Sequence, residues 1–153
     1  MDNQELSEFL KKAKKSTYAS ESAPKVASSR VESKDYEYAE GDWLYHDTYF
    51  GGVSFIGEEV AYKAGKPVWG MNYNGFVVGK NVTEEDIDRS LRPALQVFND
   101  EIIPVRGPEE FINENYKYTN NLKGDLSCFE GREEIVKAGQ VIYYAVYHGG
   151  YIK

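Results

Sequence analysis

The spacing of apolar residues predicts two helices. Residues 3–15 carry an apolar stripe at helical spacing, formed by Leu6, Phe9, Leu10 and Ala13. Thr83 is a helix-capping residue type, and a second stripe follows it, formed by Ile87, Leu91, Leu95 and Phe98. Pro93 lacks a backbone donor inside this second segment, so we expect the helix to kink or break near Arg92.

Aromatic and alternating segments predict strands in much of the remaining chain. The expected strands are residues 42–50, 55–63, 67–75, 115–121, 125–129, 131–137 and 140–148. Residues 140–148 are apolar at both sets of alternate positions, which predicts a central strand covered on both faces. Residues 16–33 are rich in Ser and Ala around Pro24, and we expect a long mobile loop there.

Two segments that lie 74 residues apart share a sequence pattern. Residues 55–75 (FIGEEVAYKAGKPVWGMNYNG) align without gaps with residues 129–149 (FEGREEIVKAGQVIYYAVYHG), with eight identities in 21 positions. Each segment follows a predicted helix, which indicates a tandem αβββ duplication. The alternative is two Lys-Ala-Gly hairpins that match by chance. With duplication, we predict an α+β fold with two helices on a mainly antiparallel, curved sheet, and a ligand site in the groove between the halves.

The composition changes this picture only in outline. The 153 residues suffice for one domain, and the 13 tyrosines favour sheet structure with polar tips at its surface. The single cysteine, Cys128, cannot form an intramolecular disulfide, so we expect it to be a small buried apolar residue in the reducing cytoplasm. The sequence begins without a signal-peptide pattern, and its apolar runs are too short for a membrane helix.

The net charge of −7 is unevenly distributed. Residues 35–153 carry eleven basic and twenty acidic side chains, and such an acidic body repels nucleic acid phosphates. The basic cluster at Lys11, Lys12, Lys14 and Lys15 fits the solvated face of a helix. We therefore expect neither direct nucleic acid binding nor a membrane partner.

Several short segments carry a resemblance to a known family. They are TYAS at 17–20, SSR at 28–30, YAEGDWLYHD at 38–47, YFGG at 49–52, FIGEE at 55–59, PVWGMNY at 67–73, RGP at 106–108 and YHGG at 147–150. The chain resembles uncharacterised bacterial domains that occur alone or C-terminal to a helix-turn-helix domain in proteins labelled as transcriptional regulators. The resemblance implies a sensor or accessory role and transfers no catalytic residue. Residues 1–34 have room for one helix, whereas a helix-turn-helix domain requires a helical bundle.

Histidines and acidic residues are the first group of candidate functional residues. His46 and His148 each follow a Tyr and come shortly before a Gly-Gly pair, so packing of the two halves could bring them together. With Asp47 they could serve in acid–base chemistry or bind a divalent ion. No tight ligand spacing is present, however, and we expect no metal. Glu58 and Glu59 are adjacent on a predicted strand and should face opposite sides.

Aromatic side chains form the second group of candidates. Trp43, Tyr45, Tyr49, Trp69 and Tyr73 lie on the predicted strands of the first half. They suit either core packing or the walls of a ligand pocket, to which Arg30 or Asn72 would add polar contacts.

These observations favour a small-molecule or peptide binding domain that acts as a sensor or accessory module. The first alternative is a protein-interaction module, with a homodimer formed through an open sheet edge. The second alternative is an enzyme that uses His46 and acidic residues. We favour a non-enzymatic role, because the chain has no P-loop, dinucleotide-binding or nucleophile-elbow motif, and we expect no cofactor.

Overall fold

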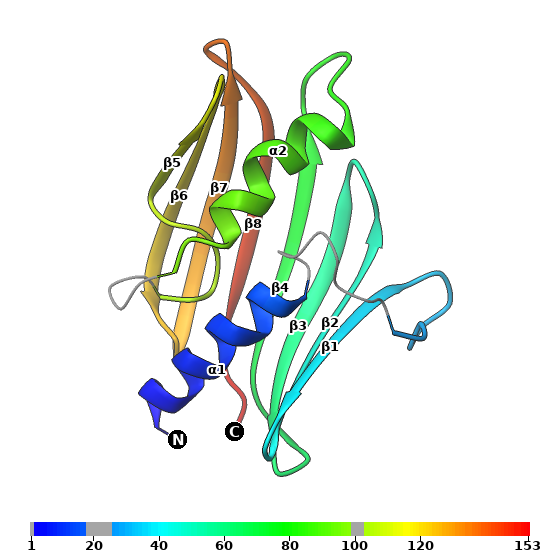
Figure 1. The fold of residues 1–153 in the computed structure, drawn as a ribbon, viewed down its shortest axis with the longest axis vertical. Helices are drawn as coiled ribbons and strands as arrows, with labels where there is room; N and C mark the ends of the chain where they lie inside the picture. The colour runs from blue at the N-terminus through cyan, green and yellow to red at the C-terminus, as the bar shows by residue number, and fades with distance from the viewer. Residues whose placement is uncertain (1, 18–25, 99–102) are drawn as a thin grey trace.

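One antiparallel sheet forms the framework of the fold, and both helices lie across the same face of it (Figure 1). A computed structural model describes residues 2–17, 26–98 and 103–153. Within these residues the strand order is β1-β2-β3-β4-β8-β7-β6-β5, so the chain forms two four-stranded halves that join at β4 and β8. Neither helix in the described ranges has the length and apolar character needed to cross a membrane.

Each half consists of a helix followed by four strands. The first half contains α1 (Asn3–Ser16), β1 (Lys34–Glu40), β2 (Trp43–Gly51), β3 (Phe55–Lys63) and β4 (Lys66–Val77). The second contains α2 (Glu84–Leu95), β5 (Glu110–Asn113), β6 (Tyr116–Asp125), β7 (Cys128–Lys137) and β8 (Gln140–Tyr151). The α+β prediction is confirmed, but each half has one strand more than the αβββ unit, because β1 and β5 were not predicted.

The helices form where their stripes predict them, except that α2 ends at Leu95, before Phe98. Asp2 caps α1 by accepting a hydrogen bond from the backbone N–H of Gln4 at 2.9 Å, and Thr83 caps α2. The expected break near Arg92 is wrong, since α2 continues to Leu95 with Pro93 in its last turn. The carbonyl of Arg89, which Pro93 leaves without its usual helical donor, instead accepts from the side-chain amide of Asn113 at 2.6 Å.

Matching hairpins organise the strands of the two halves. The turn between β3 and β4 has positive φ angles at Ala64 and Gly65, and the turn between β7 and β8 has them at Ala138 and Gly139. Both conformations belong to tight hairpin turns. The expected strand at 125–129 is wrong, because residue 125 ends β6 and residue 128 begins β7.

The core lies between the helices and one face of the sheet. Leu6, Leu10 and Leu91 are fully buried against aromatic side chains from the strands. Strand β8 is central as predicted, but the expected coverage of both faces is wrong, since Val146 on its opposite face is 38% exposed. Cys128 is exposed rather than buried. The loop predicted at 16–33 lies partly outside the described residues, which resume at residue 26.

Candidate functional site

Two carboxyl groups lie in the core beneath the helices. Asp47 on β2 pairs directly with Glu59 on β3, so both side chains point to the helix-covered face of the sheet. Asp47 is 2% exposed and Glu59 is 4% exposed. Burial of a carboxylate is unfavourable unless charges or hydrogen bonds compensate for the lost water. The partners of these two groups therefore define the chemistry of the site.

Glu59 has a cationic partner from the first helix. The ammonium of Lys14 forms an ion pair with the Glu59 carboxylate, and both side chains are buried. The Lys14 nitrogen also lies 5.9 Å from the centres of the Tyr45 and Trp69 rings. Burial lowers the pKa of Lys14, although the charge of Glu59 opposes this effect. Lys14 is thus a structural member of the core, not part of the solvated face that the sequence suggested.

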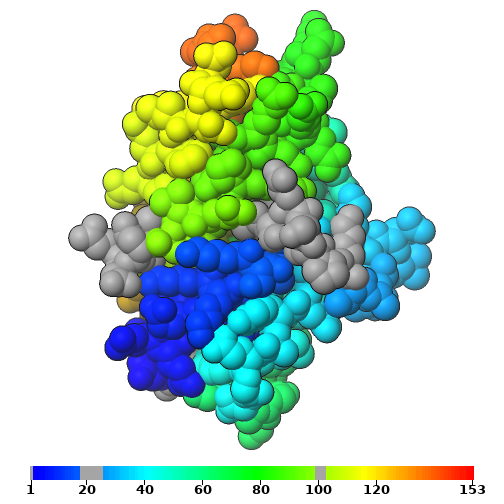
Figure 2. Space-filling view, viewed as in Figure 1, coloured from blue at the N-terminus to red at the C-terminus, as the bar shows by residue number. Residues whose placement is uncertain are grey.

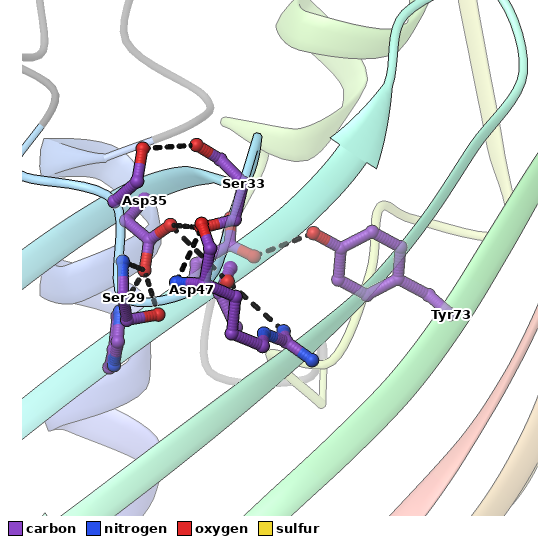
Figure 3. Close-up of polar contacts among 9 residues, drawn as sticks. Ser29, Ser33, Asp35, Asp47 and Tyr73 are labelled. Atoms are coloured by element: carbon purple, nitrogen blue, oxygen red, sulfur yellow. Dashed lines mark hydrogen bonds and ion pairs between the residues drawn. The ribbon is translucent and has the colours of Figure 1, made fainter.

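Asp47 accepts a hydrogen bond from a tyrosine two strands away. The hydroxyl of Tyr73 on β4 donates to Oδ1 of Asp47 at 2.6 Å (Figure 3). The Tyr73 side chain crosses β3 at Gly57, where a Cβ atom would collide with its ring and hydroxyl. The absence of a side chain at Gly57 therefore makes this contact possible.

A second buried ion pair comes from the other half. The guanidinium of Arg106 binds Glu133 through two hydrogen bonds, of which the Nε–Oε2 bond measures 3.0 Å. Tyr118 and Tyr143 donate to the same carboxylate at 2.7 and 3.1 Å. Arg106 also lies 5.7 Å from the centre of the Tyr73 ring, so it links the two halves.

Some of these groups line a small cavity between the sheet and α2. Its volume is about 30 Å³, and the walls comprise Asp47, Tyr49, Gly52, Phe55, Glu59, Tyr73, Glu84, Arg92 and Arg106. A cavity of this size accommodates a group about as large as one water molecule. The side chains of both helices lie across this face of the sheet (Figure 2). The walls come from both halves, and a ligand site between the halves stays a prediction.

The charges of this buried cluster do not balance. Among the described residues on this face, the buried carboxyl groups are Asp47, Glu59 and Glu133, whereas the buried cations are Lys14 and Arg106. Burial and the nearby charge of Glu59 raise the pKa of Asp47 to about 7, although the hydrogen bond from Tyr73 opposes the shift. Asp47 can therefore gain or lose a proton near neutral pH, which its ordinary pKa would not allow.

A hydrogen-bonded cluster around Asp35, the Asp35 cluster, occupies the opposite face of the sheet. Asp35 accepts hydrogen bonds from Ser29 and Ser33, and its Oδ2 lies 2.7 Å from Nε2 of His46 (Figure 3). Burial opposes ionisation of Asp35, but these hydrogen bonds outweigh it and hold the pKa well below its usual range. Together with the backbone bridge from Val26 to Asp35, the cluster fastens residues 26–33 to the sheet.

The candidate residues from the sequence separate into two groups on opposite faces. The helix-covered face carries Trp43, Tyr45, Asp47, Tyr49, Trp69 and Tyr73, all of them buried. The other face carries Arg30, His46, Asn72 and His148, of which Arg30 donates to Thr48 at 3.0 Å. One shared pocket for all ten residues is therefore excluded.

The two histidines do not approach one another. His148 on β8 pairs with Asn72 on β4, whereas His46 lies on β2, three strand spacings or about 14 Å from β8 along the sheet. No set of three His, Cys, Asp or Glu side chains in the described ranges could hold a metal ion. The metal-binding alternative for His46, His148 and Asp47 is therefore wrong for this geometry.

Sequence reasoning missed the charged partners in the core. Lys14, Arg106 and Glu133 were not among the candidates, and Glu59 was considered only as a strand residue that faces the side opposite to Glu58. The alignment of residues 55–75 with residues 129–149 matches Glu59 with Glu133. This identity could have indicated that both glutamates are buried. Nothing comparable marks Lys14 or Arg106, because charged side chains are usually exposed.

One family matches the chain across the site. The family described as "Domain of unknown function (DUF5680)" matches residues 47–152. The chain belongs to this family. The DUF5680 match begins at Asp47 and extends through Glu59, Tyr73, Arg106 and Glu133, whereas Lys14 and the Asp35 cluster precede it. No curated protein and no solved structure matches the chain.

Proposed function

We propose that this DUF5680 domain is a small-molecule binding module, and that its ligand site is the cavity bordered by Asp47, Tyr73 and Arg106. The observation that carries the proposal is the position of Asp47, a buried carboxyl in the wall of an internal cavity. Tyr49, Phe55 and Tyr73 supply aromatic walls around it. Charged side chains, among them Asp47, Glu59 and Arg106, complete much of the wall, and directed polar groups orient ligands in small-molecule sites.

The energetics of burial support a functional role for Asp47. A carboxyl with a pKa near 7 is destabilising when it ionises inside the core, and an uncharged side chain of similar shape would avoid this penalty. Strongly perturbed carboxyl groups next to a cavity are therefore candidates for a functional site.

A ligand screen with paired variants tests the proposal. Thermal unfolding would be followed for the wild type, for Asp47→Asn and for Glu58→Gln across a library of metabolites. Glu58→Gln is the matched control, since Glu58 neighbours Glu59 on β3 but is exposed on the opposite face. A ligand at about 100 times its dissociation constant stabilises the protein by about 2.7 kcal/mol.

The expected result is a set of compounds that raise the melting temperature of the wild type and of Glu58→Gln by several degrees. The same compounds should have little effect on Asp47→Asn, after correction for the stability of each variant. Ligands that stabilise all three proteins equally would place the binding site elsewhere, and the proposal would then fail.

A second candidate function is acid–base catalysis in the same cavity. The support is again Asp47, because a pKa near 7 allows a carboxyl to donate and accept protons at neutral pH. Compounds found in the screen would be incubated with the protein and followed by NMR spectroscopy. Conversion of a compound by the wild type that is lost in Asp47→Asn would favour an enzyme. If no compound is converted, the binding module remains the proposed function.

We further propose a sensor or accessory role in the interior of a bacterial cell, and an origin of the two halves by duplication. The resemblance to regulator-associated domains supports the role, and the single cysteine suits a reducing compartment. The matching hairpin turns and the paired positions of Glu59 and Glu133 support duplication. Discovery of related chains with a single α-ββββ unit that assembles in pairs would test the duplication.

A further inference from the structure

We infer that the group recognised in this cavity is one primary ammonium of a small molecule, bound beside the Asp47 carboxylate. The inference rests on the proposed function, because it assigns a ligand class to the same cavity. Three features of the site carry it: the charge balance of the cluster, the size of the cavity and the chemistry of the walls.

The charge balance favours a positively charged group. Lys14 compensates Glu59, and Arg106 compensates Glu133, so among the described residues on this face Asp47 is the buried carboxyl without a cation of its own. Glu84 and Arg92 also line the cavity, and Arg92 is paired with Asp88. An ionised Asp47 therefore leaves an uncompensated negative charge on the site, which a ligand with a positive charge would offset.

The volume selects among cations. The cavity offers about 30 Å³, and a space of roughly 10–15 Å³ is enough to hold one water molecule. An ammonium group has about the size of a water molecule and fits this space. A planar guanidinium or a trimethylammonium group contains four or more heavy atoms and would require the walls to move.

The walls present suitable partners to an ammonium. It has three N–H donors and no acceptor, and the carboxylates of Asp47 and Glu59 both line the cavity. The aromatic rings of Tyr49, Phe55 and Tyr73 also line the cavity, and aromatic rings attract cations. Both arginines in the wall already form ion pairs. Arg106 pairs with Glu133, and Nε of Arg92 lies 3.0 Å from Oδ2 of Asp88.

Ammonium binding and proton binding compete at Asp47. The charged groups that face this carboxyl are Lys14 from α1, Glu59 from β3, Glu84 and Arg92 from α2, and Arg106 from the segment before β5. Tyr36, Tyr45, Tyr49 and Tyr73 are the titratable hydroxyl groups around it. The pKa of Asp47 is raised to about 7, so the ionised form that binds a cation rises from about a tenth to about nine tenths of the protein between pH 6 and pH 8.

The test is a titration with methylammonium chloride at pH 8 and pH 6, followed by amide NMR and calorimetry at constant ionic strength. Binding should be about tenfold weaker at pH 6 than at pH 8, because the competent fraction of the protein falls by that factor. Calorimetry near pH 6 in two buffers of different ionisation enthalpy should detect release of up to about one proton per ligand. Guanidinium, tetramethylammonium and acetate salts serve as probes of size and charge.

Two variants assign the effect to the site. Asp47→Asn should abolish both the binding of methylammonium and its pH dependence, whereas Glu58→Gln removes the same charge from the opposite face and should change neither. The pH comparison on the wild type gives an independent readout if Asp47→Asn folds poorly. Ethylammonium and glycine then distinguish a simple amine from an amino acid, which adds a carboxylate to the ammonium group.

The outcomes separate the inference from the proposed function. If acetate, guanidinium or another compound binds in an Asp47-dependent way and methylammonium does not, the ammonium assignment is overturned and the ligand site stands. Methylammonium binding that is equal in Asp47→Asn would also overturn the assignment. If neither these probes nor the metabolite library perturbs the residues around Asp47, the proposed ligand site itself fails.

Discussion

In the first half of the sheet a buried tyrosine donates to a carboxyl group, and in the second half the matching tyrosine donates to an amide. Tyr73 bonds to Asp47 at 2.6 Å, and Tyr147 bonds to Oδ1 of Asn120 at the same distance. Each acceptor lies directly across from a buried glutamate, Glu59 for Asp47 and Glu133 for Asn120. The backbone geometry is thus shared, while the charge at the acceptor differs.

This difference suggests which half carries the function. In the second half, the fork of Arg106 matches both oxygens of Glu133, and the neutral Asn120 adds no charge. In the first half, Lys14 is a single point charge, and it faces both Glu59 and Asp47. The second half has the composition of a balanced structural core, and the first half retains a carboxyl that can change its charge.

The largest expected loss of stability follows from removal of the buried carboxylate in the second half. Glu133→Gln leaves Arg106 buried without a counter-ion, so we expect the free energy of unfolding to fall by about 3–5 kcal/mol. Glu59→Gln should lower it by only about 1–2 kcal/mol, because an ionised Asp47 can then serve as the counter-ion of Lys14. Urea denaturation at pH 7 would measure both, and equal losses would contradict the proposed asymmetry.

Substitution of either acceptor, Asp47→Asn or Asn120→Asp, should change the stability of the protein by an intermediate amount that depends on pH. The pKa of Asp47 is raised, so the folded protein holds this proton more tightly than the unfolded chain does. Stability is therefore greatest below the ordinary carboxyl pKa and falls as the pH rises from about 4 to about 7, by up to about 1.4 kcal/mol per pH unit. Asp47→Asn should remove this decline, and Asn120→Asp should steepen it.

The measurement is the urea midpoint of each variant between pH 4 and pH 8. The pKa of Asp35 is lowered, so its contribution to stability is present above the ordinary carboxyl pKa and is lost only as the pH falls below about 4. The two acids thus act in separate pH ranges. Parallel curves for the wild type and Asp47→Asn would show that Asp47 has an ordinary pKa.

The smallest expected loss of stability follows from removal of the hydroxyl group of either buried tyrosine. Tyr147→Phe removes the donor to Asn120, and we expect a loss of about 1 kcal/mol at every pH between 5 and 8. Tyr73→Phe should cost about as much at pH 8 but less at pH 5, because a hydrogen bond from Tyr73 stabilises the ionised form of Asp47. Thermal unfolding at the two pH values would reveal the difference, and identical pH responses would argue against it.

The sequence predicts the helices and hairpins well because they depend on local patterns. Apolar spacing locates α1 and α2, and the repeated Lys-Ala-Gly segments locate two hairpins. Strand β1 was missed because charged residues interrupt its alternation, and β5 is only four residues long. The course of α2 past Pro93 depends on Asn113, which no local pattern could supply.

The site was predicted only where its residues are aromatic or lie on a recognised strand. Asp47, Tyr49 and Tyr73 were candidates, and all three line the cavity. Lys14 and Arg106 were not, because their burial depends on carboxylates that lie 45 and 27 residues away in the chain. Ionic pairs between distant segments are a property of the folded topology, and a single sequence does not reveal them.

The ladder between β4 and β8 limits how a ligand can reach the cavity. Residues Trp69 to Val77 of β4 pair with β8 without a register shift. The two halves therefore share one hydrogen-bonded framework and cannot rotate apart as two separate domains would. Of the two helices, only α2 contributes cavity walls, through Glu84 and Arg92. Exchange of a bound ligand would therefore depend on movement of the covering segments, which are α2 and the connections that carry Gly52 and Arg106, over a fixed sheet.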